Sequence, residues 1–319
     1  NNWTLSDHDT EMAWKLFDRL AEEEGTRSNK ADPMLTKDQL RHVLGSWNHL
    51  PMGITAQDVV CKLAKYRIQL PKLYPDNISY NLLISGAVKQ GESPEFAEKI
   101  LRTMQEIRAA DPLACLPSTV TYNAVMDAWS KSDDVGAADR CYQILQHVKK
   151  LSKINGNSDL SPSKTSYGTV IAAFAKNGRA KEAESIMQEL LDDFERTNDP
   201  NLAPNRILFN SLINAWAQSG EQGAAQRAEA LLQKMHTMAT ATNNSTLFPD
   251  VISFNAVINA WAKSNDKDAP HTAERLLRKL LEHDTLTPDA YSYHGILEAW
   301  SQSQDPDALR RLQQIYKHM

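Results

Sequence analysis

The sequence predicts an all-α fold, an α-solenoid of tandem helix-turn-helix repeats. One short segment, VISFNAVINAWAKSN in one copy, recurs when the copies are aligned on a single residue, here termed the anchor. The anchors lie 42, 45, 42, 45 and 39 residues apart: Asn81, Asn123, Gly168, Asn210, Asn255 and His294. A weaker copy, KDQLRHVLGSWNHL, places Arg41 at the anchor. Self-similarity with a period of this size is the signature of a solenoid.

The first part of each repeat is predicted to be a helix. Apolar residues lie at positions −1, +2, +3 and +6 from the anchor, which are Phe254, Val257, Ile258 and Trp261 in the copy around Asn255. This is helical spacing rather than the alternation of a strand. Position +6 is usually bulky, and we expect its side chains to pack in the core: Trp47, Trp129, Phe174, Trp216, Trp261 and Trp300.

A second helix follows in each repeat, and a proline closes it. The second helix carries a small residue, a polar residue and two aliphatic residues, starting at Ala97, Cys141, Ala183, Ala228 and Ala273. Cys141 occupies the alanine position, which predicts a small packing residue rather than a reactive thiol. Each closing proline precedes Asp, Ser or Asn, here termed the cap residue, which is suited to begin the next helix. Polar insertions before these prolines, such as MATATNNSTLF, are expected to be loops.

This punctuation divides the chain into predicted segments. Residues 1–36 are expected to hold a partial N-terminal repeat, with its second helix only, and a loop. The repeat array is expected over 37–319, in units 37–76, 77–118, 119–163, 164–205, 206–250, 251–289 and 290–319. Because the chain starts with Asn and ends inside a helical pattern at Met319, we expect it to be a fragment.

Composition narrows the class of protein. The chain has 319 residues, a net charge of −5 and a pI of about 6.0, which argues against a polybasic protein that coats nucleic acid indiscriminately. No apolar run approaches the roughly 20 residues of a membrane helix. The three cysteines are isolated, and no Cys/His cluster indicates a metal site. We therefore expect no metal, no cofactor and no membrane partner.

The repeats resemble the pentatricopeptide repeat family. The resemblance rests on a first helix opening with V-x-[YF]-N, an Ala-Glu second helix and a closing Pro-Asp, and it covers residues 37–319. It implies a right-handed superhelix whose first helices line the concave face. It also implies sequence-specific binding of single-stranded RNA in a mitochondrion or chloroplast, with a targeting segment that this chain does not contain. The repeats here are several residues longer than those usual in the family.

One face of each first helix is polar. Positions 0, +4 and +8 share a face because they drift by only about 40° per step, and around Asn255 they hold Asn255, Asn259 and Lys263. Position +8 is a lysine in four repeats: Lys89, Lys131, Lys176 and Lys263. Rows of amides beside rows of cations suit a polyanion with hydrogen-bonding bases, since cations contact phosphates and amides contact base edges.

The resemblance also implies which residues select each base. Each anchor would act with the cap residue that ends its repeat, and the pairs are Asn81 with Ser118, Asn123 with Ser163, Gly168 with Asn205, Asn210 with Asp250, and Asn255 with Asp289. Asn with Asp implies uracil, and Asn with Ser implies a weaker preference for cytosine. Gly168 lacks a side chain, and His294 and Arg41 depart from the pattern. The predicted RNA register is C-C-any-U-U.

Position −3 completes the predicted interface. In the family this residue packs on the faces of neighbouring bases, and here it is Ile78, Val120, Thr165, Ile207, Ile252 or Tyr291. The expected role is processing, stabilisation or translation of an organellar transcript. A protein-interaction scaffold without base readout is the alternative, and an asparagine after an aromatic residue could simply cap its helix. We expect no enzyme and no small-molecule substrate, because no H-x-E with P-C-x-x-C and no carboxylate cluster occurs.

Overall fold

The computed structural model describes residues 76–318 apart from 90, 111–113, 156–159, 265 and 283–285, together with residues 15, 19, 22, 23, 38, 39 and 41. The predicted partial repeat over 1–36, most of the unit 37–76, and Trp47 lie outside the described residues. The chain divides into two compact units, Asn1–Ser161 and Pro162–Met319. Each is described by itself.

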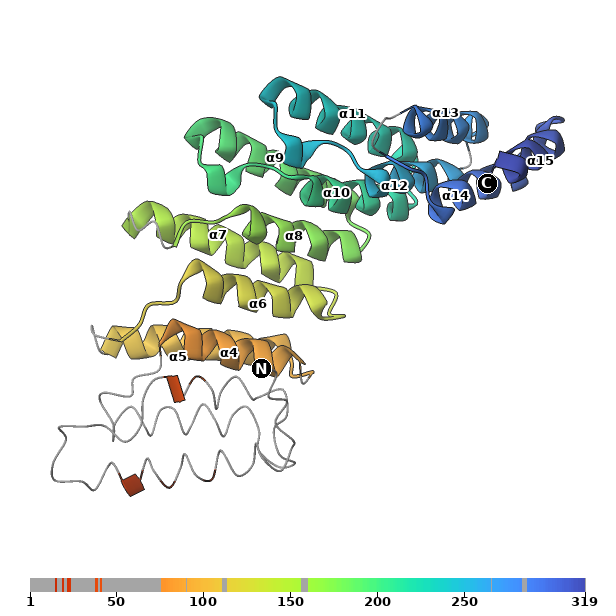
Figure 1. The fold of residues 1–319 in the computed structure, drawn as a ribbon. Helices are drawn as coiled ribbons and strands as arrows, with labels where there is room; N and C mark the ends of the chain where they lie inside the picture. The colour runs from red at the N-terminus through yellow and green to blue at the C-terminus, as the bar shows by residue number, and fades with distance from the viewer. Residues whose placement is uncertain are drawn as a thin grey trace. The chain divides into compact units, whose positions relative to one another are not determined.

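The N-terminal unit contains two described helical hairpins. Its helices are α4 (Asn77–Lys89), α5 (Pro94–Ala110), α6 (Thr119–Lys131) and α7 (Ala137–Asn155). Helix α4 packs against α5 and α6, and α6 also packs against α5 and α7 (Figure 1). The first helices α4 and α6 are therefore direct neighbours.

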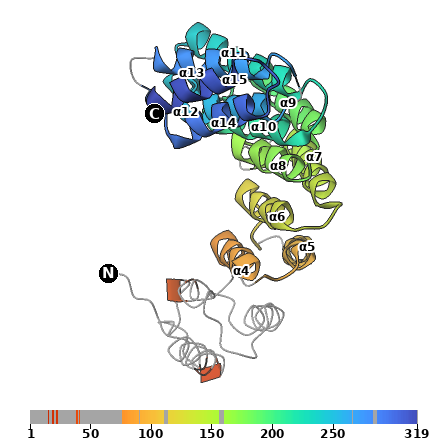
Figure 2. The same ribbon diagram turned by 90° about the vertical axis from the view of Figure 1, so that its right-hand side faces the viewer.

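The C-terminal unit repeats this arrangement. Its elements are α8 (Lys164–Lys176), α9 (Ala180–Thr197), η4 (Pro200–Leu202), α10 (Arg206–Ser219), α11 (Ala224–Thr242), η5 (Ser245–Leu247), α12 (Val251–Ala262), α13 (Ala269–Leu281), α14 (Ala290–Ser301) and α15 (Ala308–His318). Helix α10 packs between α8 and α12, and α12 packs against α14, so the first helices form one row. Helices α9, α11 and α13 each also contact the first helix that follows (Figure 2). The predicted all-α, tandem helix-turn-helix organisation is confirmed for the residues that the structure describes.

The residue after each closing proline begins the next first helix. The N-cap residues of α6, α8, α10, α12 and α14 are Ser118, Ser163, Asn205, Asp250 and Asp289. In α10, α12 and α14 the side chain of the cap residue accepts a hydrogen bond from the backbone N–H three residues later. A cap of this kind stabilises a helix by about 1 kcal/mol. The predicted boundaries of the helices therefore have a local physical cause, while the predicted domain limits stay a prediction.

The apolar columns of the first helices form the core. Val257, Ile258 and Trp261 are buried, and the prediction for position +6 is confirmed at Trp129, Phe174, Trp216, Trp261 and Trp300. Phe254 was expected in the same wall but is only half-buried, because it lines an open pocket of about 220 Å³ beside Pro249. Side chains from α11 and α13 line the rest of that pocket.

Cys141 packs as predicted from its position in the alanine column. The thiol is fully buried and donates a hydrogen bond to the carbonyl oxygen of Met126 at 3.2 Å. Burial raises the pKa of Cys141 to about 12, so the reactive thiolate is suppressed.

The polar insertions are more helical than the sequence indicated. Helix α11 continues to Thr242, through much of the segment expected to be a loop, and η5 follows. Threonine hydroxyls near the end of α11 donate to carbonyls four residues earlier, as Thr242 does to Met238. Asn243 then ends the helix with a positive φ of 49°, a conformation that asparagine tolerates. None of the described helices is long and apolar enough to cross a membrane.

Candidate nucleic-acid interface

Two anchors are joined to the predicted cap residues by hydrogen bonds. The Asn210 Nδ2 group donates to Asp250 Oδ1 at 3.3 Å, and the Asn255 Nδ2 group donates to Asp289 Oδ1 at 2.9 Å. Each bond links one first helix to the start of the next. The structure therefore brings together both of the predicted pairs that consist of Asn and Asp, and both amides remain half-buried rather than enclosed.

A third residue, which was not predicted from the sequence, completes each of these groups. Ser253 Oγ donates to Asn210 Oδ1 at 2.6 Å, and Ser292 Oγ donates to Asn255 Oδ1 at 2.6 Å. Both serines are fully buried and lie at position −2 from the next anchor. A column of Ser or Thr at this position was visible in the repeats: Ser79, Thr121, Ser166, Ser253 and Ser292.

Electrostatics keep the cap carboxylates ionised. Burial alone would raise the pKa of Asp250, but hydrogen bonds from Ser253 and Asn210 and the charge of Arg206, 3.2 Å away, outweigh it, so the pKa is lowered. The pKa of Asp289 is lowered against the same effect of burial, by hydrogen bonds from its own first turn and from the Asn255 amide. An ionised carboxylate only accepts hydrogen bonds, which fixes the amide nitrogen of each anchor toward it.

The N-terminal unit shows a different arrangement at Asn81. In the residues that the structure describes, Asn81 makes no hydrogen bond to Ser118, and its Oδ1 atom is buried without a partner. Ser118 instead bonds with Thr121, its neighbour in the capping box. Asn123 and Ser163 belong to different compact units. The serine caps provide no carboxylate to hold the amide.

Arg41, the anchor of the weaker repeat copy, also contacts the cap residue that follows it. Its guanidinium donates to Asp76, which precedes α4, and to Asp38 at 2.7 Å. Asp76 also accepts from the backbone N–H of Ser79 at 3.0 Å. The contact from an anchor to the next cap residue therefore recurs with a different side chain, and the cap carboxylate is neutralised by arginine.

At Gly168 the neighbouring side chain leaves too little room for a Cβ atom. A Cβ atom added to Gly168 would lie 2.9 Å from Leu208 Cδ2, which is closer than real Cβ contacts. Leu208 occupies position −2 of the following repeat, where other repeats carry Ser or Thr, and it is buried. Asn205 caps α10 through its bond to the Leu208 backbone N–H at 3.1 Å. Because neither Gly168 nor Leu208 carries a side-chain amide or hydroxyl, this repeat boundary lacks the hydrogen-bonded group found at Asn210 and Asn255.

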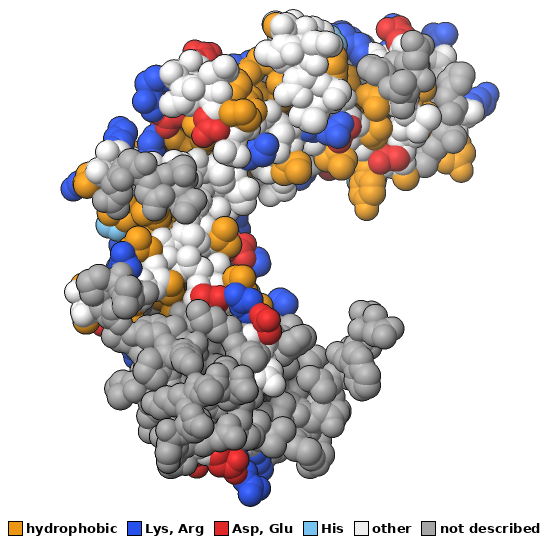
Figure 3. Space-filling view, turned by 60° about the vertical axis from the view of Figure 1, so that its left-hand side comes forward, with side chains coloured by type: hydrophobic (Ala, Val, Ile, Leu, Met, Phe, Trp, Pro, Cys, Tyr) orange, Lys and Arg blue, Asp and Glu red, His pale blue; other side chains and the backbone are white. Residues whose placement is uncertain are grey.

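The predicted stacking residues are exposed. The side chains at position −3 that are large and apolar have exposed fractions between 51% and 78%: Ile78, Val120, Ile207, Ile252 and Tyr291. Figure 3 shows hydrophobic side chains reaching the surface among charged ones. Since these residues lie on helices whose other apolar positions are buried, their exposure marks a face suited to an apolar or aromatic ligand surface.

The predicted lysines differ in their surroundings. Lys131 forms an ion pair with Asp127 of its own helix at 2.6 Å, so part of its charge is neutralised. Lys89, Lys176 and Lys263 are exposed at or just after the ends of their helices.

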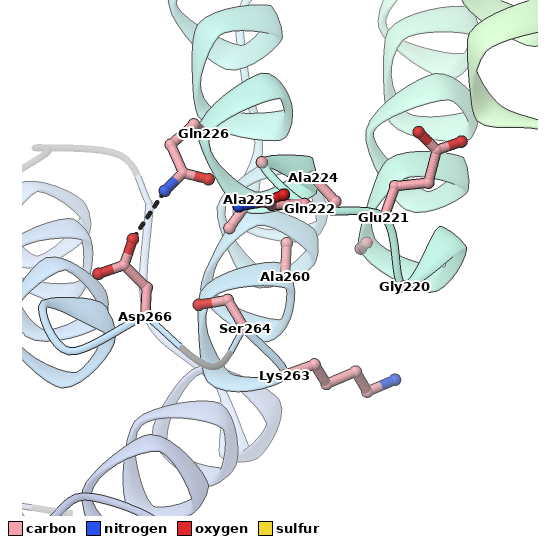
Figure 4. A pocket seen from close by; sticks show the side chains of 12 residues that line it. Gly220, Glu221, Gln222, Ala224, Ala225, Gln226, Ala260, Lys263, Ser264 and Asp266 are labelled. Atoms are coloured by element: carbon pink, nitrogen blue, oxygen red, sulfur yellow. Dashed lines mark hydrogen bonds between the residues drawn. The ribbon is translucent and has the colours of Figure 1, made fainter.

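Lys263 lies beside an open cavity of about 600 Å³ between the ends of α10 and α12 and the start of α11. In Figure 4 its side chain points away from the Gln226–Asp266 hydrogen bond.

Comparison with known proteins places these features in a family. Residues 120–147 and 165–193 match the PPR repeat, and residues 69–132 match the pentatricopeptide repeat domain. A chloroplastic pentatricopeptide repeat-containing protein from Arabidopsis thaliana is 27% identical over 165 residues, which are 52% of this chain and 18% of the relative. The small ribosomal subunit protein mL103 (rPPR7) from Arabidopsis thaliana is 24% identical over 166 residues, 44% of this chain and 37% of the relative.

Among solved structures, the pentatricopeptide repeat protein PPR10 in complex with an 18-nt psaJ RNA element aligns with 98% of this chain and 48% of that chain, at 17% identity and a TM-score of 0.39. The chain thus spans less than half the length of each of these three proteins. Matches to repeat models of the pentatricopeptide repeat family fall in both compact units, at residues 69–147 and 165–193, and they support membership of the chain in that family.

Proposed function

We propose that this chain binds single-stranded RNA and that each anchor with its cap residue selects one base. The observation that carries the proposal is the pair of hydrogen bonds from Asn210 to Asp250 and from Asn255 to Asp289. These bonds fix the orientation of a half-buried amide on a face that also carries exposed apolar side chains. A merely capping asparagine would need no such partner in the next repeat.

The chemistry of the oriented amide favours uracil. One N–H of the Asn210 Nδ2 group is bonded to Asp250, and the second N–H has no partner in the part of the chain that the structure describes. A free donor complements the O4 carbonyl of uracil, whereas the exocyclic amine at the same position of cytosine would meet it donor to donor. The exposed side chains of Ile207 and Ile252 would contact base faces on either side.

The cellular role that we propose is based on the relatives. One relative is chloroplastic and another is a small ribosomal subunit protein. The role that we propose is therefore organellar, in the processing, stability or translation of a transcript.

Selection from a random RNA pool tests the proposal. The wild-type chain should enrich sequences containing C-C-any-U-U. Asn210→Ala should relax the fourth nucleotide alone, and Asn255→Ala should relax the fifth alone, because each removes one oriented amide. Each variant is the control for the other. Enrichment that both substitutions leave unchanged would count against base readout and favour a protein-interaction scaffold.

A further inference from the structure

In three consecutive repeats of the C-terminal unit, the residue at position −2 faces the anchor of the repeat before it. Ser253 contacts Asn210 and Ser292 contacts Asn255, both through the amide oxygen at 2.6 Å. Leu208 contacts the position of the missing side chain at Gly168. The anchor and the −2 residue are therefore neighbours across the repeat boundary, although they lie about 40 residues apart in sequence.

Serine at this position fixes the amide in one orientation. Asp250 Oδ1 and Ser253 Oγ approach Asn210 together, and the carboxylate takes the amide nitrogen because it only accepts. The Ser253 hydroxyl lies 2.6 Å from the amide oxygen and 2.9 Å from Asp250 Oδ1, and we assign its single proton to the closer acceptor, the amide oxygen. The same hydroxyl accepts the Asp250 backbone N–H at 3.1 Å, which sets its own direction. Rotating the amide by 180° would break both bonds, so the outward N–H is the donor presented to a base.

Leucine at this position excludes the amide instead. A Cβ at Gly168 would lie 2.9 Å from Leu208 Cδ2, so an asparagine there would require the buried leucine side chain to shift. Glycine at the anchor and leucine at −2 are thus complementary in volume, as asparagine and serine are complementary in hydrogen bonding.

We propose that the −2 residue is a positioning residue that decides whether the preceding anchor reads a base. Ser253 and Ser292 orient reading amides, and Leu208 closes the position at Gly168. The inference rests on the proposed function and deepens it, because recognition then depends on three residues rather than on the anchor and cap alone.

A loss-of-hydroxyl variant gives the first test. In the full 319-residue chain, Ser253→Ala should lower the preference for uracil over cytosine at the fourth nucleotide by about threefold to tenfold, the value of one hydrogen bond. The preference at the fifth nucleotide, which depends on Ser292, is the internal control. Ser253→Thr keeps the hydroxyl and should keep the preference. Binding is measured with oligonucleotides that differ at one nucleotide.

A gain-of-function variant separates positioning from helix capping. Gly168→Asn with Asn205→Asp supplies an anchor and a cap but keeps Leu208. Adding Leu208→Ser completes the group. Only the triple variant should acquire a uracil preference at the third nucleotide. It should also melt at a higher temperature than the double variant, in which the introduced asparagine and Leu208 compete for one space.

The outcomes are distinguishable. A wild-type chain with no base preference at the fourth and fifth nucleotides would overturn the proposed function itself. A wild-type preference that persists in Ser253→Ala, or an equal preference in the double and triple variants, would overturn only the role of the −2 residue. If Ser253→Ala does not fold, as judged by circular dichroism, the comparison of the double and triple variants at Gly168 still decides the question.

Discussion

Among single residues, Asp250 serves two structural purposes at once. It caps α12 by accepting the Ser253 backbone N–H at 2.9 Å, and it accepts the Asn210 amide from the previous repeat. Its other carboxylate oxygen, Oδ2, forms an ion pair with Arg206. Because one carboxylate satisfies all three donors, changes in its charge affect the helix start and the anchor together.

The lowered pKa of Asp250 predicts a specific dependence of stability on pH. A carboxyl whose pKa is lower when folded stabilises the protein above its ordinary value of 3.8, and this stabilisation is lost as the pH falls through the folded value. The difference in unfolding free energy between wild type and Asp250→Asn should therefore stay constant from pH 7 to about 5 and shrink below about 4.

Urea unfolding followed by circular dichroism measures this difference. Asp199→Asn is a suitable control, since Asp199 caps the short η4 helix on the surface and has no partner among the anchors. A difference between wild type and Asp250→Asn that does not change with pH would show that the carboxylate charge is unimportant.

Between helices, a glutamate on each of two second helices joins neighbouring repeats. Glu184 of α9 accepts the Trp216 indole N–H at 3.0 Å and pairs with Arg227 of α11 at 2.5 Å. The same arrangement recurs one repeat later at Glu229 with Trp261 and Arg275. The Ala-Glu motif of the second helix therefore has a function in packing, and the tryptophan at +6 is both buried and oriented.

Glu184→Ala should destabilise the C-terminal unit. The substitution leaves the N–H of the buried Trp216 without an acceptor, and the loss of such a bond to a charged group costs about 1–3 kcal/mol. Arg227→Ala removes only the more exposed partner and should cost less than about 1 kcal/mol. Thermal and urea unfolding of the two variants measures the order, and an equal or reversed order would contradict this role for Glu184.

Over the whole molecule, charge limits how RNA can be held. The net charge is −5, and position +8 supplies four lysines, of which Lys131 is paired with Asp127. Affinity under the proposed function would therefore come mainly from base stacking and hydrogen bonding rather than from phosphate contacts.

This charge distribution predicts a shallow dependence of RNA affinity on salt. With at most four phosphate contacts from the lysine column, the slope of log K against log salt should be no steeper than about −3 for a single strand. Fluorescence anisotropy across a range of salt concentrations measures the slope. Lys263→Ala should reduce it by about 0.7, and Lys234→Ala, on a second helix, should leave it unchanged. A much steeper slope would mean that cations outside the column contact the RNA.

The helices and their repeat follow from the sequence alone. The apolar spacing around Asn255 predicted burial of Val257, Ile258 and Trp261, and the residue after five of the closing prolines proved to be a helix N-cap. These features could be predicted because helical periodicity and capping are local: each depends on residues within one or two turns.

The orientation of each anchor depends instead on tertiary packing. Asn81 and Asn210 look alike in sequence, yet Asn210 bonds to Asp250 and Ser253 whereas the Asn81 oxygen has no partner among the described residues. The Gly168–Leu208 contact and the partial exposure of Phe254 were likewise invisible in the repeats. Contacts between residues some 40 positions apart depend on how neighbouring helices pack, and side-chain volume and hydrogen-bond geometry at that boundary set the result.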